Sequence, residues 1–297
     1  MENSLDGVLE YALQVGAVDL ILAEGFVPSL RIAGRVRNIP NAEKLSFGEL
    51  ESFFGPLVGE SGAFCGGPWA KTEWRVRYSR EAFGKTVVLR PVGMDAPELS
   101  TLAFPEAAMN LLGVDSGLVL FAGPKLSGKT TTASAFVSEL CSRRTLRASF
   151  LDALPEYRIR TGESLVVRKR PKVSAEEEIR QGILSGTDLF WLGDLDENAL
   201  LPALDAAVSG ALVVATYTAG SARDVMAYLS SSTSCENRKL LRASLAANLR
   251  GVVTQRLVLA DDRKSFVPSW EVFNVDSCVA PLIVSGEFEK IFESPKA

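Results

Sequence analysis

Short apolar runs alternate with longer mixed segments over the second two thirds of the chain. Runs at 117–122, 189–192 and 211–215 contain no charged residue, which is typical of strands that are buried on both faces of a sheet. Each run is followed by a segment with helical character, the first of them at 129–142. Strands that alternate with helices predict a largely parallel α/β sheet.

The first part of the chain has a different pattern. A predicted helix at 5–14 precedes strand-like segments at 19–23, 30–32 and 86–89, with Gly and Pro between them. A chain of 297 residues is also long for a single core. Two prolines, Pro97 and Pro105, bracket a Ser/Thr-containing stretch that reads as a linker. We therefore predict an N-terminal α+β domain over 1–96, a linker over 97–104 and an α/β domain over 105–297.

Composition removes several kinds of chemistry. The sequence contains no histidine, so every histidine base, nucleophile pair and metal ligand is excluded. A net charge of −4 predicts no nucleic-acid partner. The four cysteines are scattered without a CxxC pair, which argues against a zinc or disulfide framework. With no signal-peptide pattern and no apolar run of about 18 residues, we expect a cytoplasmic protein without a transmembrane segment.

One segment carries a specific signal. Residues 123–130 read Gly-Pro-Lys-Leu-Ser-Gly-Lys-Thr, the GxxxxGK[ST] pattern of a phosphate-binding loop. It follows a predicted buried strand and opens a predicted helix, which is the context that supports the motif. We predict that ATP is bound here with Mg²⁺, and that the Thr130 hydroxyl is a metal ligand. The predicted nucleotide-binding residues are Gly123, Pro124, Ser127, Gly128, Lys129, Thr130 and Thr131.

Such a site also needs carboxylates at the ends of neighbouring strands. Asp194 follows the apolar run at 189–192 and is the candidate second metal ligand. Asp152 follows a predicted strand at 146–151 and is the candidate that orients the attacking water. Glu156 is the alternative to Asp152 for this role.

Taken in order, these motifs resemble those of type IV pilus retraction (twitching motility, PilT-type) ATPases of the secretion-ATPase superfamily. Outside the phosphate-binding loop no single motif is specific, but their order and spacing are. The similar segments are 16–22, 28–36, 74–77 with Arg90, 117–132, 151–157, 188–194, 209–216, 254–257 and 270–272.

The resemblance implies a P-loop (RecA-like) ATPase core with a PAS-like N-terminal domain, assembled as a homohexameric ring. It further implies a motor that acts at the inner membrane on a pilus platform protein. Arg75 and Arg90 match the family's paired arginines, and could stabilise charge on the transferring phosphate as catalytic residues. The alternative is that both arginines make surface salt bridges.

The departures from the family are as informative. Asp152 and Asp194 replace glutamates, and a carboxylate shortened by about 1 Å can cost ~10²-fold in rate. The family's two box histidines and several site arginines are also missing, with Ala211, Thr218, Leu184, Asp196 and Tyr228 in their places. We therefore expect weak hydrolysis. The sequence leaves open a hydrolysis-deficient regulatory subunit that acts beside an active paralogue, and an ATPase of a secretion system.

Overall fold

The computed structural model describes residues 4–32, 35–55, 60–82, 84–92, 95–152, 155–168, 174–231, 238–260 and 266–293. The chain forms two compact units. The first contains residues 1–94 and 153–158, and the second contains 95–152 and 159–297. The chain therefore passes from one unit to the other at 94–95, at 152–153 and at 158–159.

The first unit is built on an antiparallel sheet in the order β3-β2-β1-β6-β5-β4. Its helix α1 (Leu5–Gln14) begins at Ser4, whose hydroxyl accepts a hydrogen bond from the backbone N–H of Gly7. Helix α2 (Phe47–Phe54) begins with a reciprocal capping box between Ser46 and Glu49. The strands are β1 (Asp19–Ala23), β2 (Ser29–Ile32), β3 (Arg35–Asn38), β4 (Ser61–Trp69), β5 (Thr72–Glu81) and β6 (Gly84–Val92).

The second unit contains a seven-stranded sheet in the order β13-β12-β7-β11-β10-β8-β9. Its strand pairs are parallel except for β12 with β13, which is antiparallel. The strands are β7 (Gly117–Gly123), β8 (Arg147–Phe150), β9 (Leu165–Arg168), β10 (Leu189–Leu192), β11 (Leu212–Thr218), β12 (Leu249–Leu259) and β13 (Phe266–Asn274).

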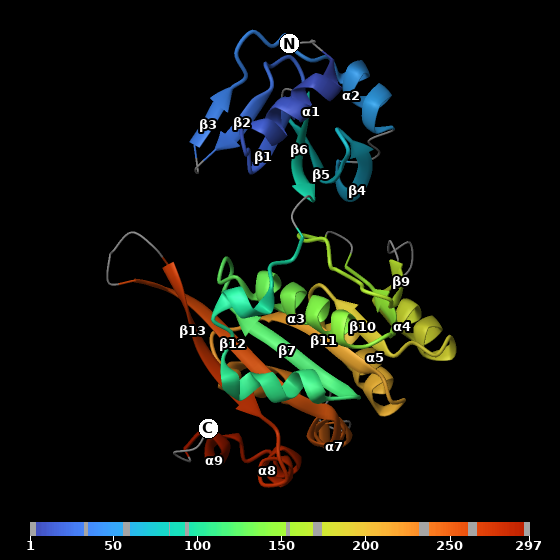
Figure 1. Cartoon of the computed structure of the whole chain (residues 1–297), viewed down its shortest axis with the longest axis vertical. Helices are drawn as coiled ribbons and strands as arrows, with labels where there is room; N and C mark the ends of the chain where they lie inside the picture. The colour runs from blue at the N-terminus through green and yellow to red at the C-terminus, as the bar shows by residue number, and fades with distance from the viewer. Residues whose placement is uncertain are drawn as a thin grey trace. The chain divides into compact units, whose positions relative to one another are not determined.

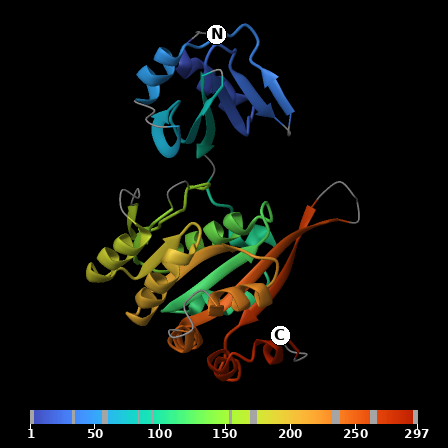
Figure 2. The same cartoon turned by 180° about the vertical axis from the view of Figure 1, so that it is seen from behind.

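Helices cover both faces of this sheet (Figures 1 and 2). The 3-10 helices η1 (Leu99–Leu102) and η2 (Glu106–Gly113) and helix α3 (Lys129–Arg143) pack on one face. The remaining helices belong to the other layer: α4 (Ala175–Leu184), α5 (Glu197–Val208), α6 (Ala222–Ser231), α7 (Arg238–Asn248), α8 (Ala280–Ser285) and α9 (Phe288–Glu293).

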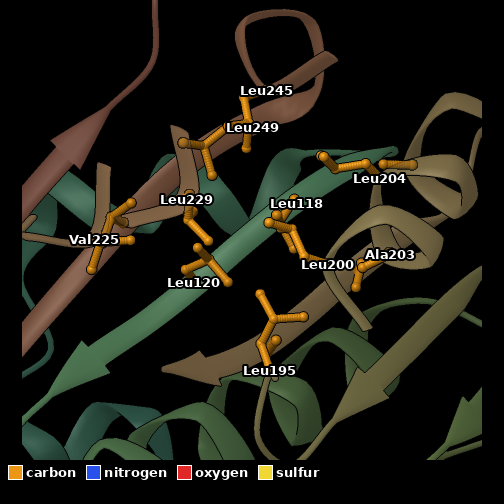
Figure 3. Packing of buried hydrophobic residues seen from close by; sticks show 14 of the residues in the cluster. Leu118, Leu120, Leu195, Leu200, Ala203, Leu204, Val225, Leu229, Leu245 and Leu249 are labelled. Atoms are coloured by element: carbon orange, nitrogen blue, oxygen red, sulfur yellow. The ribbon is translucent and has the colours of Figure 1, made fainter. Parts of the chain in front are cut away.

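The second unit has an apolar core on each face of its sheet, and residues of strand β7 belong to both. Its Leu118 and Leu120 contact the cluster that includes Leu200 and Leu204 of α5 (Figure 3), while Phe121 packs on the α3 side. Every residue of β7 is buried. Burial on both faces thus explains why this strand has no polar positions, as the sequence predicted. The predicted α/β class, with an α+β N-terminal unit and a P-loop core, is confirmed.

The β12–β13 pair was not predicted as a hairpin. Near its tip both strands extend beyond the rest of the sheet (Figure 1), and five apolar side chains are exposed there. They are Leu257, Val258, Leu259, Phe266 and Val267. Within the described part of the chain, no helix has both the length and the apolar composition needed to cross a bilayer.

Candidate functional site

The loop at 124–128 joins β7 directly to α3. Gly123 has φ of 159° and Gly128 has φ of 84°, values that L side chains rarely adopt. A Cβ on Gly123 would also lie 2.4 Å from the carbonyl oxygen of Gln255 and 2.4 Å from Ser127 Oγ. Glycine is therefore required at both positions of the motif by backbone conformation, and at Gly123 also by lack of space.

The groups around this loop fit a bound phosphate. Among the described residues, no side chain caps the N-terminus of α3, so its first N–H groups can face an anion. Ser127 Oγ is buried and has no hydrogen-bond partner in the described structure. Lys129 Nζ lies 3.5 Å from the carbonyl oxygen of Pro124, folded back along the loop. Thr130 and Thr131 follow in the first turn of the helix and are half-buried.

The predicted acids lie at the same edge of the sheet as the loop. Strands β8, β10, β11 and β7 are parallel neighbours, so their C-terminal ends share one edge. Thr218, the last residue of β11, is in register with Gly123. Asp152 and Asp194 follow the ends of β8 and β10. The fold thus brings these two acids to the edge that carries the loop.

Asp152 packs against the backbone beside Asp194. The backbone N–H of Leu151 donates to the carbonyl oxygen of Trp191 at 2.9 Å, which extends the pairing of β8 with β10. A Cβ on Gly193 would lie 2.5 Å from the carboxyl carbon of Asp152. The residue that precedes Asp194 in sequence is therefore in contact with Asp152.

Asp194 interacts with Thr216 of β11 and with Lys129 of α3. Thr216 Oγ1 on β11 donates to the carbonyl oxygen of Gly193 and lies 3.5 Å from Asp194 Oδ1. Surrounding protein partly desolvates the Asp194 carboxyl group, although the residue as a whole is exposed, and this raises its pKa. The positive charge of Lys129 and the Thr216 hydrogen bond oppose that rise. The interaction with Lys129 links the acid electrostatically to the loop.

Thr216 was not predicted as a site residue. It is 2% exposed, and a buried hydroxyl needs a hydrogen-bond partner. A polar residue that interrupts the apolar run of β11 next to the sheet edge was the available signal.

Arg75 and Arg90 belong to the first unit, where each is ion-paired. They are register partners on β5 and β6, so their side chains leave the same face of the sheet. Arg75 Nη1 lies 3.1 Å from Glu156 Oε1, and Arg90 Nη2 lies 2.8 Å from Asp19 Oδ1. Glu156, considered above as an alternative to Asp152, is thus the partner of Arg75 within the same unit.

Asp196 and Tyr228, two of the three positions where the resemblance predicts arginines, make contacts of their own. Asp196 caps α5, its carboxylate accepting from the backbone N–H of Ala199 at 2.8 Å. The Tyr228 hydroxyl donates to Glu197 Oε1. Burial, followed by the neighbouring Tyr228, raises the pKa of Tyr217 far above its ordinary value. Leu184 is exposed at the end of α4. None of these side chains supplies positive charge.

A family model described as "Type II/IV secretion system protein" matches residues 70–279, more than half of the chain. The chain belongs to this family. The matched range of the secretion-system family begins within the first unit and covers the loop, both acids and the β12–β13 pair.

Relatives within this family are distant. An uncharacterised protein of Escherichia coli K12, YggR, is 25% identical over 97% of this chain and 91% of its own length. The type IV pilus retraction ATPase PilT of Pseudomonas aeruginosa is 24% identical over 84% of this chain and 77% of its own. A crystal structure described as the pilus retraction motor PilT with bound ADP has a TM-score of 0.87 at 20% identity, covering 98% of this chain and 88% of that one. This last likeness establishes the fold.

Proposed function

We propose that this protein binds Mg-ATP at the loop 123–130 and hydrolyses it slowly, as a motor ATPase of type IV pilus retraction. The observation that carries the proposal is the convergence of two carboxylates and the phosphate-binding loop on one sheet edge. Asp194 interacts with Lys129 of the loop, and Asp152 contacts the residue before Asp194.

Each residue has a role that its chemistry allows. Lys129 contacts the β- and γ-phosphates, and the backbone N–H groups at the start of α3 hold the phosphate oxygens. Thr130 and Asp194 hold the metal directly or through water. When bound, Mg²⁺ neutralises charge on the phosphates. Asp152 orients the attacking water.

The arginines enter the proposal as catalytic groups that stabilise transition-state charge. Arg75 is the better buried of the two, with 13% of its side chain exposed against 48% for Arg90. Since both are ion-paired within their own unit, each would have to leave or share its carboxylate partner to reach a phosphate. A homohexamer, with nucleotide bound by each subunit, is the proposed working assembly.

The retraction role rests on sequence similarity to a pilus retraction ATPase over 84% of the chain. In this role the protein would act at the inner membrane through a pilus platform protein. Its family description also includes secretion, so an ATPase of a secretion system is the alternative motor.

A second candidate is a regulatory subunit that binds nucleotide and acts beside an active paralogue. The contacts of Asp196 and Tyr228 favour it, because these side chains are used for capping and for a bond to Glu197 where positive charge is missing. Nucleotide binding is common to both candidates. They differ in turnover.

Turnover of the purified protein, alone and mixed with an intact pilus motor protein, separates the candidates. Lys129→Ala removes a charge-assisted contact, so nucleotide affinity should fall roughly 10- to 150-fold. Asp152→Glu should raise turnover of a motor whose acid is too short, with affinity nearly constant. Turnover that stays at background in both the wild-type protein and Asp152→Glu favours the regulator. Robust turnover after Asp152→Ala would show that another acid activates the water.

A further inference from the structure

Gln255 on β12 contacts both ends of the phosphate-binding loop. Its carbonyl oxygen would lie 2.4 Å from a Cβ on Gly123, and its Nε2 would lie 2.9 Å from a Cβ on Gly128. Its Oε1 accepts a hydrogen bond from Thr132 Oγ1 at 2.8 Å. One residue therefore touches the start of the loop, its end and the first turn of α3.

Both partners of this hydrogen bond are buried, Gln255 at 5% exposure and Thr132 at 1%. A buried amide is costly unless it is bonded, so the pair fixes the side chain of Gln255 in one position. Strand β12 is itself held on both sides. Thr254 is in register with Ala122 of β7, and Gln255 is in register with Trp270 of β13. Gln255 is thus a rigid support that joins the loop to the sheet.

We infer that Gln255 is a positioning residue for nucleotide binding, acting through Thr132 and the two loop glycines. This inference rests on the proposed binding of nucleotide at the loop. Gln255 sets the shape of the loop before nucleotide arrives, so its loss should weaken ATP and ADP alike. The groups that act on the γ-phosphate and on the water stay in place, so the rate of the bound complex should change little.

The chain offers a closely matched set of variants. Thr132→Val removes the hydroxyl at nearly constant volume, and Thr132→Ser keeps it. Gln255→Leu removes the acceptor from the other side. Thr254→Val is the control, because the hydroxyl of Thr254 is buried one residue away on β12 and has no hydrogen-bond partner among the described residues.

Two measurements test the inference. The first is the dissociation constant of Mg-ADP and Mg-ATP, alongside kcat. Thr132→Val should raise both constants about threefold to tenfold, the effect of one buried neutral hydrogen bond, whereas Thr132→Ser and Thr254→Val should stay near wild type. Combining Thr132→Val with Gln255→Leu should add little to either single variant, because they remove the same bond. The second is amide hydrogen exchange over 124–130 without nucleotide, which should be faster in Thr132→Val and in Gln255→Leu.

The outcomes are separable from failure of the proposed function. If the wild-type protein binds no nucleotide, the proposed function fails. Faster amide hydrogen exchange over 124–130 in the variants would still show that Gln255 holds the loop in shape. Unchanged exchange in both Thr132→Val and Gln255→Leu overturns the inference. Lower melting temperatures with unchanged dissociation constants also overturn it, because they leave Gln255 a merely structural residue.

Discussion

The carboxyl carbon of Asp152 lies where only a glycine at position 193 leaves room for it, 2.5 Å from the place of a Cβ on Gly193. The backbone of Gly193 is not in the left-handed region, so the need for glycine here is one of space. Gly193 immediately precedes Asp194. The contact therefore sets the spacing of the two acids on the sheet edge.

Gly193→Ala should displace the Asp152 carboxylate. Because a misplacement of about 1 Å can cost ~10²-fold in rate, we expect kcat to fall by roughly 10-fold or more, while the affinity for Mg-ADP changes little. Steady-state turnover with a separate ADP titration measures this. Gly113→Ala is the control, since a Cβ there meets no atom within 4 Å. Wild-type turnover in Gly193→Ala would remove Asp152 from the proposed chemistry.

Because of Asp194, turnover should be lost on acidification at a higher pH than an ordinary aspartate would give. Its pKa is raised by burial, so the carboxylate becomes protonated, and loses its value as a metal ligand, at a higher pH than an ordinary aspartate. Thr216→Val removes a hydrogen bond that lowers this pKa and should move the acid limit of Mg²⁺-dependent turnover to still higher pH. A pH–rate profile whose acid limb is identical in wild type and Thr216→Val would contradict the assignment.

Glu156→Gln tests whether Glu156 is a structural partner or a catalytic acid. Loss of the ion pair with the largely buried Arg75 should lower the free energy of unfolding of the first unit by about 1 kcal/mol, without lowering turnover. Thermal and denaturant melts, with turnover in parallel, measure both effects. Glu60→Gln is the control, because its pair with Arg80 is exposed and 3.9 Å long. A large loss of turnover with unchanged stability would transfer the water-activating role to Glu156.

Cys141 on α3 should make the second unit sensitive to alkali. Burial raises the pKa of its thiol to about 11 from an ordinary 9.0, and a hydrogen bond with Ser164 opposes the rise. Above pH 9 the unfolded chain loses this proton first, so the thiol's contribution to stability is present below pH 9 and is lost as the pH rises toward 11. The loss amounts to roughly 2–3 kcal/mol.

Denaturant melts of wild type and Cys141→Ala at pH 8 and pH 10.5 measure this contribution as a difference. The gap in stability between the two proteins should narrow at the higher pH. Ser134→Ala, a buried change on the same helix without a titrating group, should keep a constant gap from wild type. A constant gap for Cys141→Ala would mean that the thiol does not titrate as described.

The parts of this protein that the sequence predicted best are those with a local signal. The helix Leu5–Gln14 and the strands Asp19–Ala23 and Leu189–Leu192 have the bounds expected from their patterns. The convergence of Asp152 and Asp194 followed from a general property of parallel sheets, whose strand ends share an edge.

The contacts that support the site have no local signal. Gln255 is 123 residues from Thr132, and nothing in the sequence around either residue indicates the other. The role of Arg75 on phosphate was predicted from the family resemblance, and nothing in the sequence indicated its ion-pair partner Glu156, 81 positions away. Such pairs depend on tertiary packing, which hydrophobic periodicity does not encode.

The division of the first unit between residues 1–94 and 153–158 limits how this protein can exchange parts with its relatives. A single crossover between genes at codon 94 would transfer Arg75 and leave Glu156 behind. The hybrid would pair an arginine from one parent with whatever residue the other parent has at that position. A functional exchange of this unit needs two inserted pieces, so its two parts should be inherited together.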